Sequence, residues 1–122
     1  MHKGGYTYIL TNITRTTLYV GVTSDLVQRI AQHKSHQYKN SFTSKYNVEY
    51  CIYYEEFPTI IKAINREKEI KKWSRHKKEL LINKVNPEWL EIDFNQGKTK
   101  ISFKDEVTKI LDEILKENKE KE

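Results

Sequence analysis

The chain has 122 residues, of which 37% are hydrophobic and 32% are charged, and it carries a formal net charge of +5. This length suits one domain with a single core. No apolar run approaches the ~20 residues of a membrane-spanning helix, and the N-terminus lacks the apolar segment of a secretory signal. We therefore expect a cytoplasmic protein without a membrane partner.

The positive charge is unevenly distributed along the chain. Residues 101–122 hold 5 Lys+Arg and 7 Asp+Glu, so the excess of basic residues belongs to residues 1–100. An acidic partner should therefore meet the body of the protein and not its tail. The single cysteine, Cys51, excludes an internal disulfide, and its apolar and aromatic neighbours predict a buried strand residue.

The first third of the chain has the pattern of a hairpin followed by a helix. Residues 6–11 and 18–22 are rich in aromatic and β-branched residues, and a short polar connection separates them. Ser24 can cap a helix over residues 25–36. Its predicted buried stripe consists of Leu26, Val27, Ile30 and Ala31. Arg29 and His33 lie one turn apart on a flank of that stripe, and these residue types handle phosphate and protons.

Residues 37–47 are polar, basic and aromatic, without a helical or strand period. This pattern predicts a loop, in which Lys39 and Lys45 alternate with Tyr38, Phe42 and Tyr46. Such a mixture suits contacts with the backbone and bases of a nucleic acid, and it equally suits an ordinary polar connector. Residues 48–57 are predicted to form the third strand, which ends at Pro58.

A second helix is predicted over residues 60–73, with Thr59 as its N-cap. Its apolar face is expected to comprise Ile60, Ile61, Ala63, Ile64 and Ile70. Glu67 falls in the middle of this face, where a carboxylate is costly unless a partner compensates its charge. That partner is either Lys71, one turn further on, or a bound metal ion.

Ser74 can start another helix that runs through residues 80–82, and a basic cluster surrounds its beginning. The cluster consists of Lys68, Lys71, Lys72, Arg75, Lys77 and Lys78. It is typical either of a surface that follows phosphates or of a solvated helix face. Beyond it, Asn86 and Pro87 have the pattern of an N-cap followed by proline at the first helical position, and Trp89 is expected to be a packing anchor.

The last part of the chain differs from the rest. We expect one domain over residues 1–95, followed by an amphipathic helix and a charged tail over residues 96–122. Its apolar residues repeat at helical spacing from Phe103 to Leu115. Residues 102–116 can pack on the body, form a homodimer or bind a partner protein, and the sequence does not choose among these.

The candidate residues supply the parts that phosphodiester hydrolysis needs. Arg29 can stabilise charge on the phosphorus centre, Glu67 can hold Mg²⁺ or Mn²⁺ together with water and phosphate, and a tyrosine or His33 can take a proton from water. Tyr8 and Tyr19 lie on adjacent predicted strands, and Gly21 follows near a strand end.

In its motifs the chain resembles the GIY-YIG nuclease family. The likeness is carried by residues 6–10, residues 18–23, the helical pair Arg29 and His33, and Glu67. It covers about residues 5–90 and is nearest to small single-domain bacterial proteins related to the nuclease module of the excision-repair protein UvrC. Tyr8 takes the place of the tyrosine in the first motif, and residues 19–21 take the place of the second.

The resemblance implies an α+β fold, with a three-stranded antiparallel sheet flanked by helices, and single-metal cleavage of nucleic acid. By analogy with the family, Tyr8 acts as general base, Tyr19 and His33 order water and phosphate, and Glu67 binds the metal. The family's late asparagine corresponds to Asn83 or Asn86, of which we prefer Asn86. We therefore expect a metal-dependent DNA endonuclease. The alternatives are a nucleic-acid-binding module of the same fold and an interaction domain that acts through its terminal helix.

Overall fold

The computed structural model describes residues 4–37 and 39–94, and the expected helix over residues 102–116 lies outside this part of the chain. The described elements are, in chain order, β1 (Gly5–Thr11), β2 (Leu18–Thr23), α1 (Leu26–Lys34), α2 (Phe42–Lys45), β3 (Tyr50–Phe57), α3 (Ile60–Lys71) and α4 (Arg75–Val85). No helix among the described residues is long and apolar enough to cross a membrane.

The three strands form one antiparallel sheet in the order β2-β1-β3. The α+β fold class predicted from the sequence is thereby confirmed. Strand β1 is central, and the connection between β1 and β2 is stabilised by Asn12, whose side-chain oxygen accepts hydrogen bonds from the backbone N–H groups of Thr16 and Thr17. As the central strand, β1 pairs with β2 on one side and with β3 on the other.

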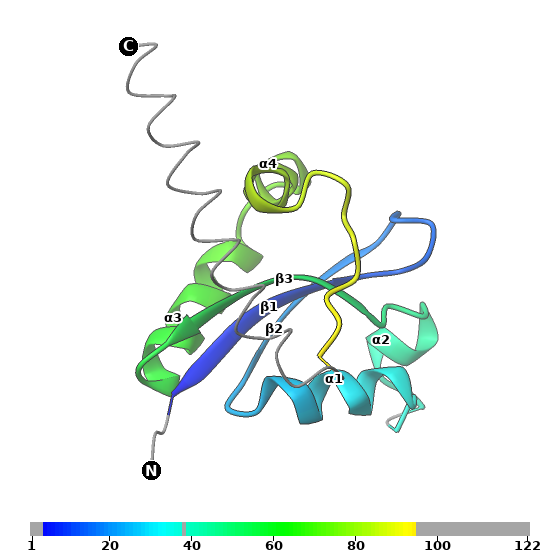
Figure 1. Cartoon of the computed structure of the whole chain (residues 1–122), viewed down its shortest axis with the longest axis horizontal. Coiled ribbons are helices and arrows are strands. Elements are labelled where there is room, and N and C mark those ends of the chain that lie inside the picture. The colour runs from blue at the N-terminus through cyan, green and yellow to red at the C-terminus, as the bar shows by residue number, and fades with distance from the viewer. Residues whose placement is uncertain (1–3, 38, 95–122) are drawn as a thin grey trace.

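Helices cover both faces of the sheet (Figure 1). On one face, Tyr8 and Leu10 of β1 pack with Leu26 and Ile30 of α1. On the other face, residues of β1, β2 and β3 pack with Ile70 of α3 and with α4. Because side chains alternate along a strand, Tyr8 belongs to the α1 side and its neighbours Thr7 and Ile9 to the α3 side.

Helix α1 differs from its prediction at its start and in its buried stripe. Its N-cap is Asp25 and not Ser24, because the Asp25 side chain accepts the hydrogen bond from the N–H of Gln28. The buried residues are Leu26, Ile30 and His33. Val27 is 41% exposed and Ala31 is exposed as well, so the prediction for these two was wrong. The buried stripe follows the spacing of four and three residues, which brings His33 into the core.

Two further predictions need correction on the next elements. Residues 37–47 are not wholly loop, because Ser41 caps the short helix α2 by accepting from the N–H of Ser44. Thr59 caps α3 as predicted, but Ile61 is 66% exposed. Its side chain lies outside the face that contacts the sheet, which Ala63, Glu67 and Ile70 occupy at the spacing of one turn.

The end of α4 is also different from its prediction. Ser74 caps the helix as expected, but Asn86 terminates α4 instead of starting a new helix. No helix follows in residues 87–94. Trp89 has a φ of 53°, which is the left-handed region and is incompatible with a right-handed helix. The proline and the asparagine therefore belong to an irregular segment, in which Trp89 packs against the core as predicted.

Candidate active site

Tyr8 occupies its position because its partner on β2 is a glycine. Tyr8 pairs with Gly21 across the two strands, and the Tyr8 ring lies directly over it. A Cβ atom at position 21 would stand 2.4 Å from Tyr8 Cζ and 2.5 Å from its hydroxyl oxygen. No real Cβ tolerates such contacts, so Gly21 provides the space for the tyrosine.

His33 links Tyr8 to α2. Its Nε2 lies 3.1 Å from the Tyr8 hydroxyl, and its Nδ1 lies 3.0 Å from Oγ1 of Thr43. Burial lowers the pKa of His33 to about 4, and the positive charge of Arg29 lowers it in the same direction. The imidazole is therefore neutral at pH 7, with one ring nitrogen as donor and the other as acceptor.

Tyr8 and Arg29 influence each other in opposite ways. Burial raises the pKa of Tyr8 to about 12, although the hydrogen bond from Arg29 pulls it down. Burial works to lower the pKa of Arg29, but contacts with Tyr8 and Tyr19 outweigh it and leave that pKa above its usual value. At neutral pH the site therefore holds a protonated phenol, a neutral imidazole and a charged guanidinium.

Tyr19 lies at the outer side of this group. Its ring centroid is 6.4 Å from that of Tyr8, 5.8 Å from that of His33 and 6.3 Å from that of Phe42. Tyr8 is only 1% exposed, whereas Tyr19 and Arg29 are half-buried. A ligand would therefore meet Tyr19 and Arg29 first and reach Tyr8 from their side.

Glu67 lies apart from the tyrosines. It is 8% exposed on α3, and its carboxylate pairs with Lys71 at 2.6 Å. The alternative of pairing with Lys71 is thus present in the structure. α3 packs on the face of the sheet opposite Tyr8, so the helix that carries Glu67 and the helix that carries Arg29 and His33 lie on different faces of the sheet.

The side chain of Asn86 is hydrogen-bonded to backbone groups. Its amide nitrogen donates to the carbonyl oxygens of Ile52 and Leu90 at 2.8 and 2.9 Å, and its amide oxygen accepts from the N–H of Leu90 at 3.0 Å. These bonds attach the segment after α4 to the central part of β3. Asn83, the other candidate for the family's late asparagine, accepts from the Trp89 indole.

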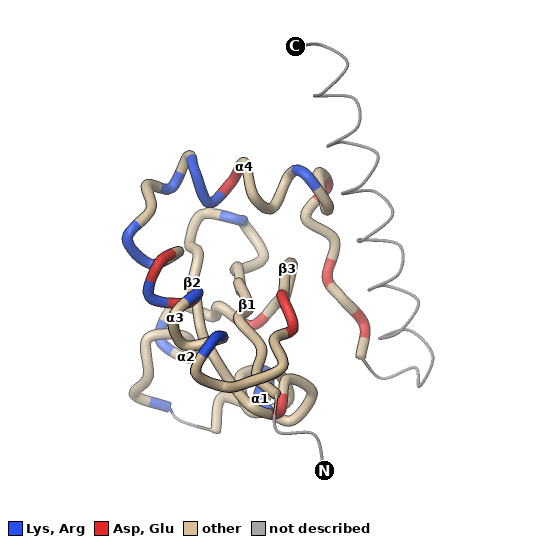
Figure 2. Tube along the Cα trace, turned by 90° about the vertical axis from the view of Figure 1, so that its left-hand side faces the viewer, with Lys and Arg blue, Asp and Glu red and all other residues tan. Residues whose placement is uncertain are grey.

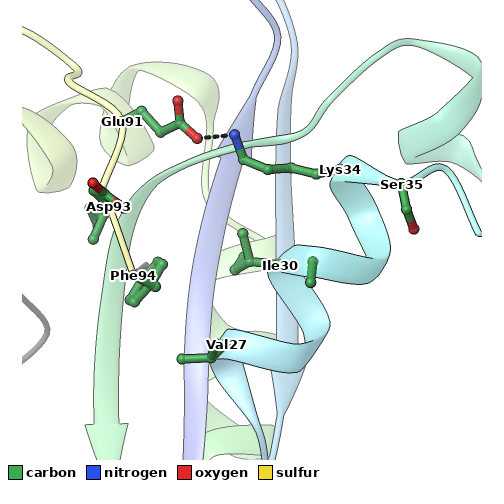
Figure 3. Close-up of a pocket in the computed structure, with 9 residues that line it drawn as sticks. Val27, Ile30, Lys34, Ser35, Glu91, Asp93 and Phe94 are labelled. Atoms are coloured by element: carbon green, nitrogen blue, oxygen red, sulfur yellow. Dashed lines mark ion pairs between the residues drawn. The ribbon is translucent and has the colours of Figure 1, made fainter. Parts of the chain in front are cut away.

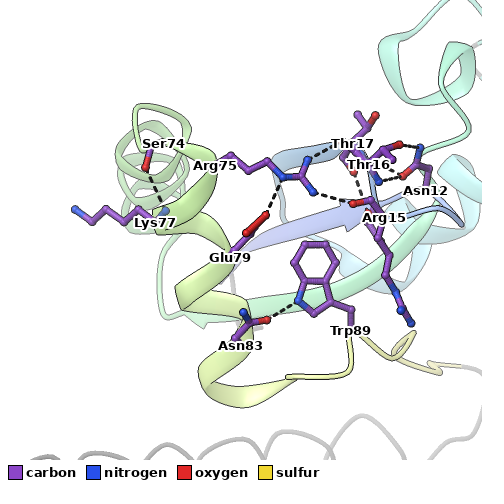
Figure 4. Close-up of polar contacts among 11 residues, drawn as sticks. Asn12, Arg15, Thr16, Thr17, Ser74, Arg75, Lys77, Glu79, Asn83 and Trp89 are labelled. Atoms are coloured by element: carbon purple, nitrogen blue, oxygen red, sulfur yellow. Dashed lines mark hydrogen bonds and ion pairs between the residues drawn. The ribbon is translucent and has the colours of Figure 1, made fainter.

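The predicted basic residues do not all face solvent freely. Lysines and arginines gather at the end of α3 and the start of α4 (Figure 2). Arg75, however, donates to the carbonyl oxygens of Arg15 and Thr16 and pairs with Glu79, so it fastens α4 to the hairpin (Figure 4). The Nζ atom of Lys77 lies 4.3 Å from the centre of the Trp73 ring. The other residues predicted to contact nucleic acid in this region are the exposed Lys68, Lys71 and Lys72 and the half-buried Lys78.

A separate groove of about 690 Å³ lies between α1 and residues 91–94. Figure 3 shows Val27 and Ile30 on one side and Phe94 on the other, with an ion pair between Lys34 and Glu91. None of the predicted catalytic residues lines it. The groove and the tyrosine-histidine group are therefore distinct features of the α1 side.

Comparison with known proteins identifies the family of the chain. Residues 4–80 match the family model described as the GIY-YIG catalytic domain. The chain belongs to the GIY-YIG family. Its membership confirms the resemblance noted in the sequence and places the protein among nucleases and their relatives.

The relatives of this chain include small proteins, most of whose length it matches. A UPF0213 protein of Syntrophus aciditrophicus is 35% identical over 83 residues, which cover 68% of this chain and 93% of the relative. One from Bacillus pumilus is 32% identical over 88 residues, covering 72% and 89%. The solution NMR structure of a UPF0213 protein from Bacillus halodurans is 29% identical, with a TM-score of 0.46 over 70% of this chain and 89% of that one.

Sequence reasoning missed one member of the group. Thr43 is 5% exposed, and its hydroxyl also lies 3.2 Å from that of Ser41. It therefore orients the His33 ring from the side opposite Tyr8. The available signal was the Ser-Phe-Thr-Ser run, in which Ser41 has the pattern of an N-cap before a short helix.

Proposed function

We propose that this GIY-YIG protein is a divalent-metal-dependent endonuclease that hydrolyses phosphodiester bonds of DNA. The observation that carries the proposal is the contact between Tyr8 and His33, with Arg29 beside them. It brings a proton donor, a proton acceptor and a fixed positive charge together at one place. A hydrophobic core could be packed at this place without a tyrosine, a histidine and an arginine, so the combination points to chemistry.

The proton chemistry follows from the protonation states. As water attacks the phosphorus, its proton passes to the Tyr8 oxygen, while the Tyr8 hydroxyl proton passes to Nε2 of His33. This route needs a neutral imidazole, which the lowered pKa of His33 supplies. It also avoids a free phenolate, which the raised pKa of Tyr8 disfavours. The route uses the tautomer in which Nδ1 carries the ring hydrogen and donates it to Oγ1 of Thr43, 3.0 Å away.

Arg29 supplies the charge that this chemistry requires. It stays protonated because its contacts with Tyr8 and Tyr19 hold its pKa high. Its guanidinium can bind the non-bridging oxygens of the phosphate, where negative charge builds up in the transition state. Tyr19, half-buried next to it, can donate a hydrogen bond to the same phosphate.

The fit of a divalent metal ion depends on Glu67. No group of three or more His, Cys, Asp or Glu in residues 4–37 and 39–94 is arranged to hold a metal. A single carboxylate nevertheless suits Mg²⁺ or Mn²⁺, which keep several waters and take further oxygens from the phosphate. Lys71, whose side chain is 53% exposed, can leave Glu67 for solvent. Glu67 would hold the ion, which when bound would stabilise the leaving oxygen.

DNA is the proposed substrate because the body of the chain is basic and several lysines are exposed around the site. Lys45 is exposed on α2, the helix that contacts His33 through Thr43, and Lys39 is exposed shortly before it. Lys68 of α3 and Lys72, its C-cap, follow Glu67 and are exposed as well. Such residues bind phosphates without reading sequence. A binding module without catalysis is the second candidate, which the existing pairing of Glu67 with Lys71 favours.

A nicking assay separates these candidates. Supercoiled, branched and single-stranded DNA are incubated with the protein in Mg²⁺ or Mn²⁺, alongside Glu67→Gln and Arg29→Gln. The proposal predicts metal-dependent cleavage that both variants lose. Lys62→Gln, an exposed lysine on the same helix as Glu67, is the matched control and should cleave at the parent rate. Salt-sensitive binding without cleavage by the parent would instead identify a binding module.

A further inference from the structure

The rings around Tyr19 continue outward to the surface of α2. Tyr19 stacks against Phe42 with an interplanar angle of 25°, and Phe42 lies 4.8 Å from Tyr46 between ring centroids. Through Tyr19, these two outer rings are connected to Tyr8 and His33. An uninterrupted series of aromatic rings therefore runs from the buried centre of the site to solvent.

About half of the surface of each of the two outer residues is exposed to solvent. Phe42 is 49% exposed and Tyr46 is 51% exposed, although both are large aromatic side chains. Exposed apolar groups of this size next to a functional site commonly bind a ligand. We call Phe42 and Tyr46 together the aromatic platform.

We propose that the aromatic platform stacks an unpaired base next to the phosphate bound at Tyr19 and Arg29. This inference rests on the proposed function, because it assigns a substrate class to the same site. Stacking on aromatic rings is a property of every base and does not depend on sequence. It requires that the base be free of its duplex partners, so the platform favours single-stranded or locally unpaired substrates.

The platform is held in place before a ligand arrives. Ser41 caps α2, and Thr43, the residue after Phe42, is buried against His33. Such pre-organisation reduces the entropy that is lost when a base stacks. The same anchor ties the platform to the proton acceptor of the site, so a stacked base has a defined position relative to the phosphate.

Positive charge accompanies the platform in the same segment of the chain. Lys45 belongs to α2 and is exposed, and Lys39 is exposed on the segment before it. Aromatic rings beside lysines are the usual composition of surfaces that bind single strands, where the rings hold bases and the cations hold the backbone. The alternation of lysine and aromatic residues seen in the sequence thus acquires a specific role.

Binding measured without cleavage tests the inference. The full-length protein is titrated in EDTA with fluorescein-labelled single-stranded DNA, single-stranded RNA of the same sequence, and duplex DNA, and anisotropy is recorded. Phe42→Leu and Tyr46→Leu keep an apolar side chain at each position but remove the ring. Thermal unfolding and the NMR signals of His33 verify that each variant retains the fold.

The inference predicts that each variant binds the single strands about 5- to 100-fold more weakly and changes duplex binding less than about twofold. Phe42→Trp keeps an aromatic ring and should bind single strands like the parent. Bound single-stranded DNA should quench the fluorescence of the new tryptophan. Ile13→Ala, which truncates a 76% exposed residue in the turn between β1 and β2, is the control and should bind like the parent. Equal losses for single strands and duplex, or no loss, would overturn the inference. A difference between the DNA and RNA arms identifies which strand the platform prefers.

This test is independent of the proposed activity. If the parent cleaves nothing while the platform variants lose single-strand binding, the endonuclease proposal fails and the platform stands. If the parent cleaves DNA and the platform variants bind single strands normally, only the platform is rejected.

Discussion

The hydroxyl of Tyr8 lies 3.1 Å from Nε2 of His33, although the two residues are 25 positions apart in the chain. One comes from the central strand and the other from the helix that covers it. The contact places a proton donor with a raised pKa against a proton acceptor with a lowered one. It is the feature on which the proposed chemistry depends.

His33 should titrate far below an ordinary histidine. NMR titration of the folded protein should give a pKa of about 4, because burial and Arg29 both disfavour the charged imidazole. Between about pH 6.5 and pH 4 the unfolded chain binds a proton that the folded chain does not. His33 therefore makes the free energy of unfolding fall as the pH drops through this window. Arg29→Gln should raise the pKa of His33, and an unchanged value in that variant would contradict the contribution assigned to Arg29.

Gly21→Ala should destabilise the protein by about 1–3 kcal/mol, since the new Cβ overlaps the Tyr8 ring. Urea unfolding measures the loss. In a Tyr8→Leu background the same substitution should cost less, because the ring that it strikes is gone. Equal costs in the two backgrounds would mean that Tyr8 is not the group that requires a glycine at this position.

Replacing Lys71 tests whether Glu67 can hold a metal ion. Lys71→Met should lower stability by about 0.5 kcal/mol, the upper end of the usual range for such a pair on one helix. Because the carboxylate then lacks its cation, Mn²⁺ should raise the unfolding temperature of this variant more than that of the parent. The double variant Glu67→Gln with Lys71→Met is the control and should lose the Mn²⁺ effect. An identical Mn²⁺ effect in all three proteins would place the ion elsewhere.

Asn86→Ala should lower stability by about 2–4 kcal/mol, because it removes three hydrogen bonds and leaves backbone groups of Ile52 and Leu90 unpaired. Among molecules that stay folded, the cleavage rate should change little. Asn83→Ala, which removes one bond at an exposed position, should cost no more than about 1 kcal/mol. A large rate loss with unchanged stability would show that Asn86 takes part directly in the chemistry.

Much of the fold could be predicted from the sequence because its signals are local. The β-branched and aromatic runs gave the strands, and the caps Thr59 and Ser74 gave the starts of α3 and α4. Other local signals were ambiguous. Ser24 and Asp25 are both good N-caps, and only the backbone path after β2 decides between them. Asn86 before Pro87 has the pattern of a helix start, but its amide is used by Ile52 and Leu90.

The candidate site was only partly predictable for a different reason. The spacing on α1 identified Arg29 and His33, but not that His33 is buried and that Thr43 holds it, since that contact depends on how α2 packs. Likewise, the apolar pattern of α3 located Glu67 on the buried face without showing which side of the sheet that face covers. Such relationships arise from tertiary packing, which a helical or strand period does not encode.

Single-turnover cleavage of DNA by the parent, Tyr8→Phe, His33→Gln and the double variant tests the central claim most directly. If Tyr8 and His33 move one proton as a unit, each single variant should lose about 100-fold or more in rate, and the double variant should be no slower than either. A parent without metal-dependent cleavage, or a Tyr8→Phe variant that cleaves at the parent rate, would contradict the account.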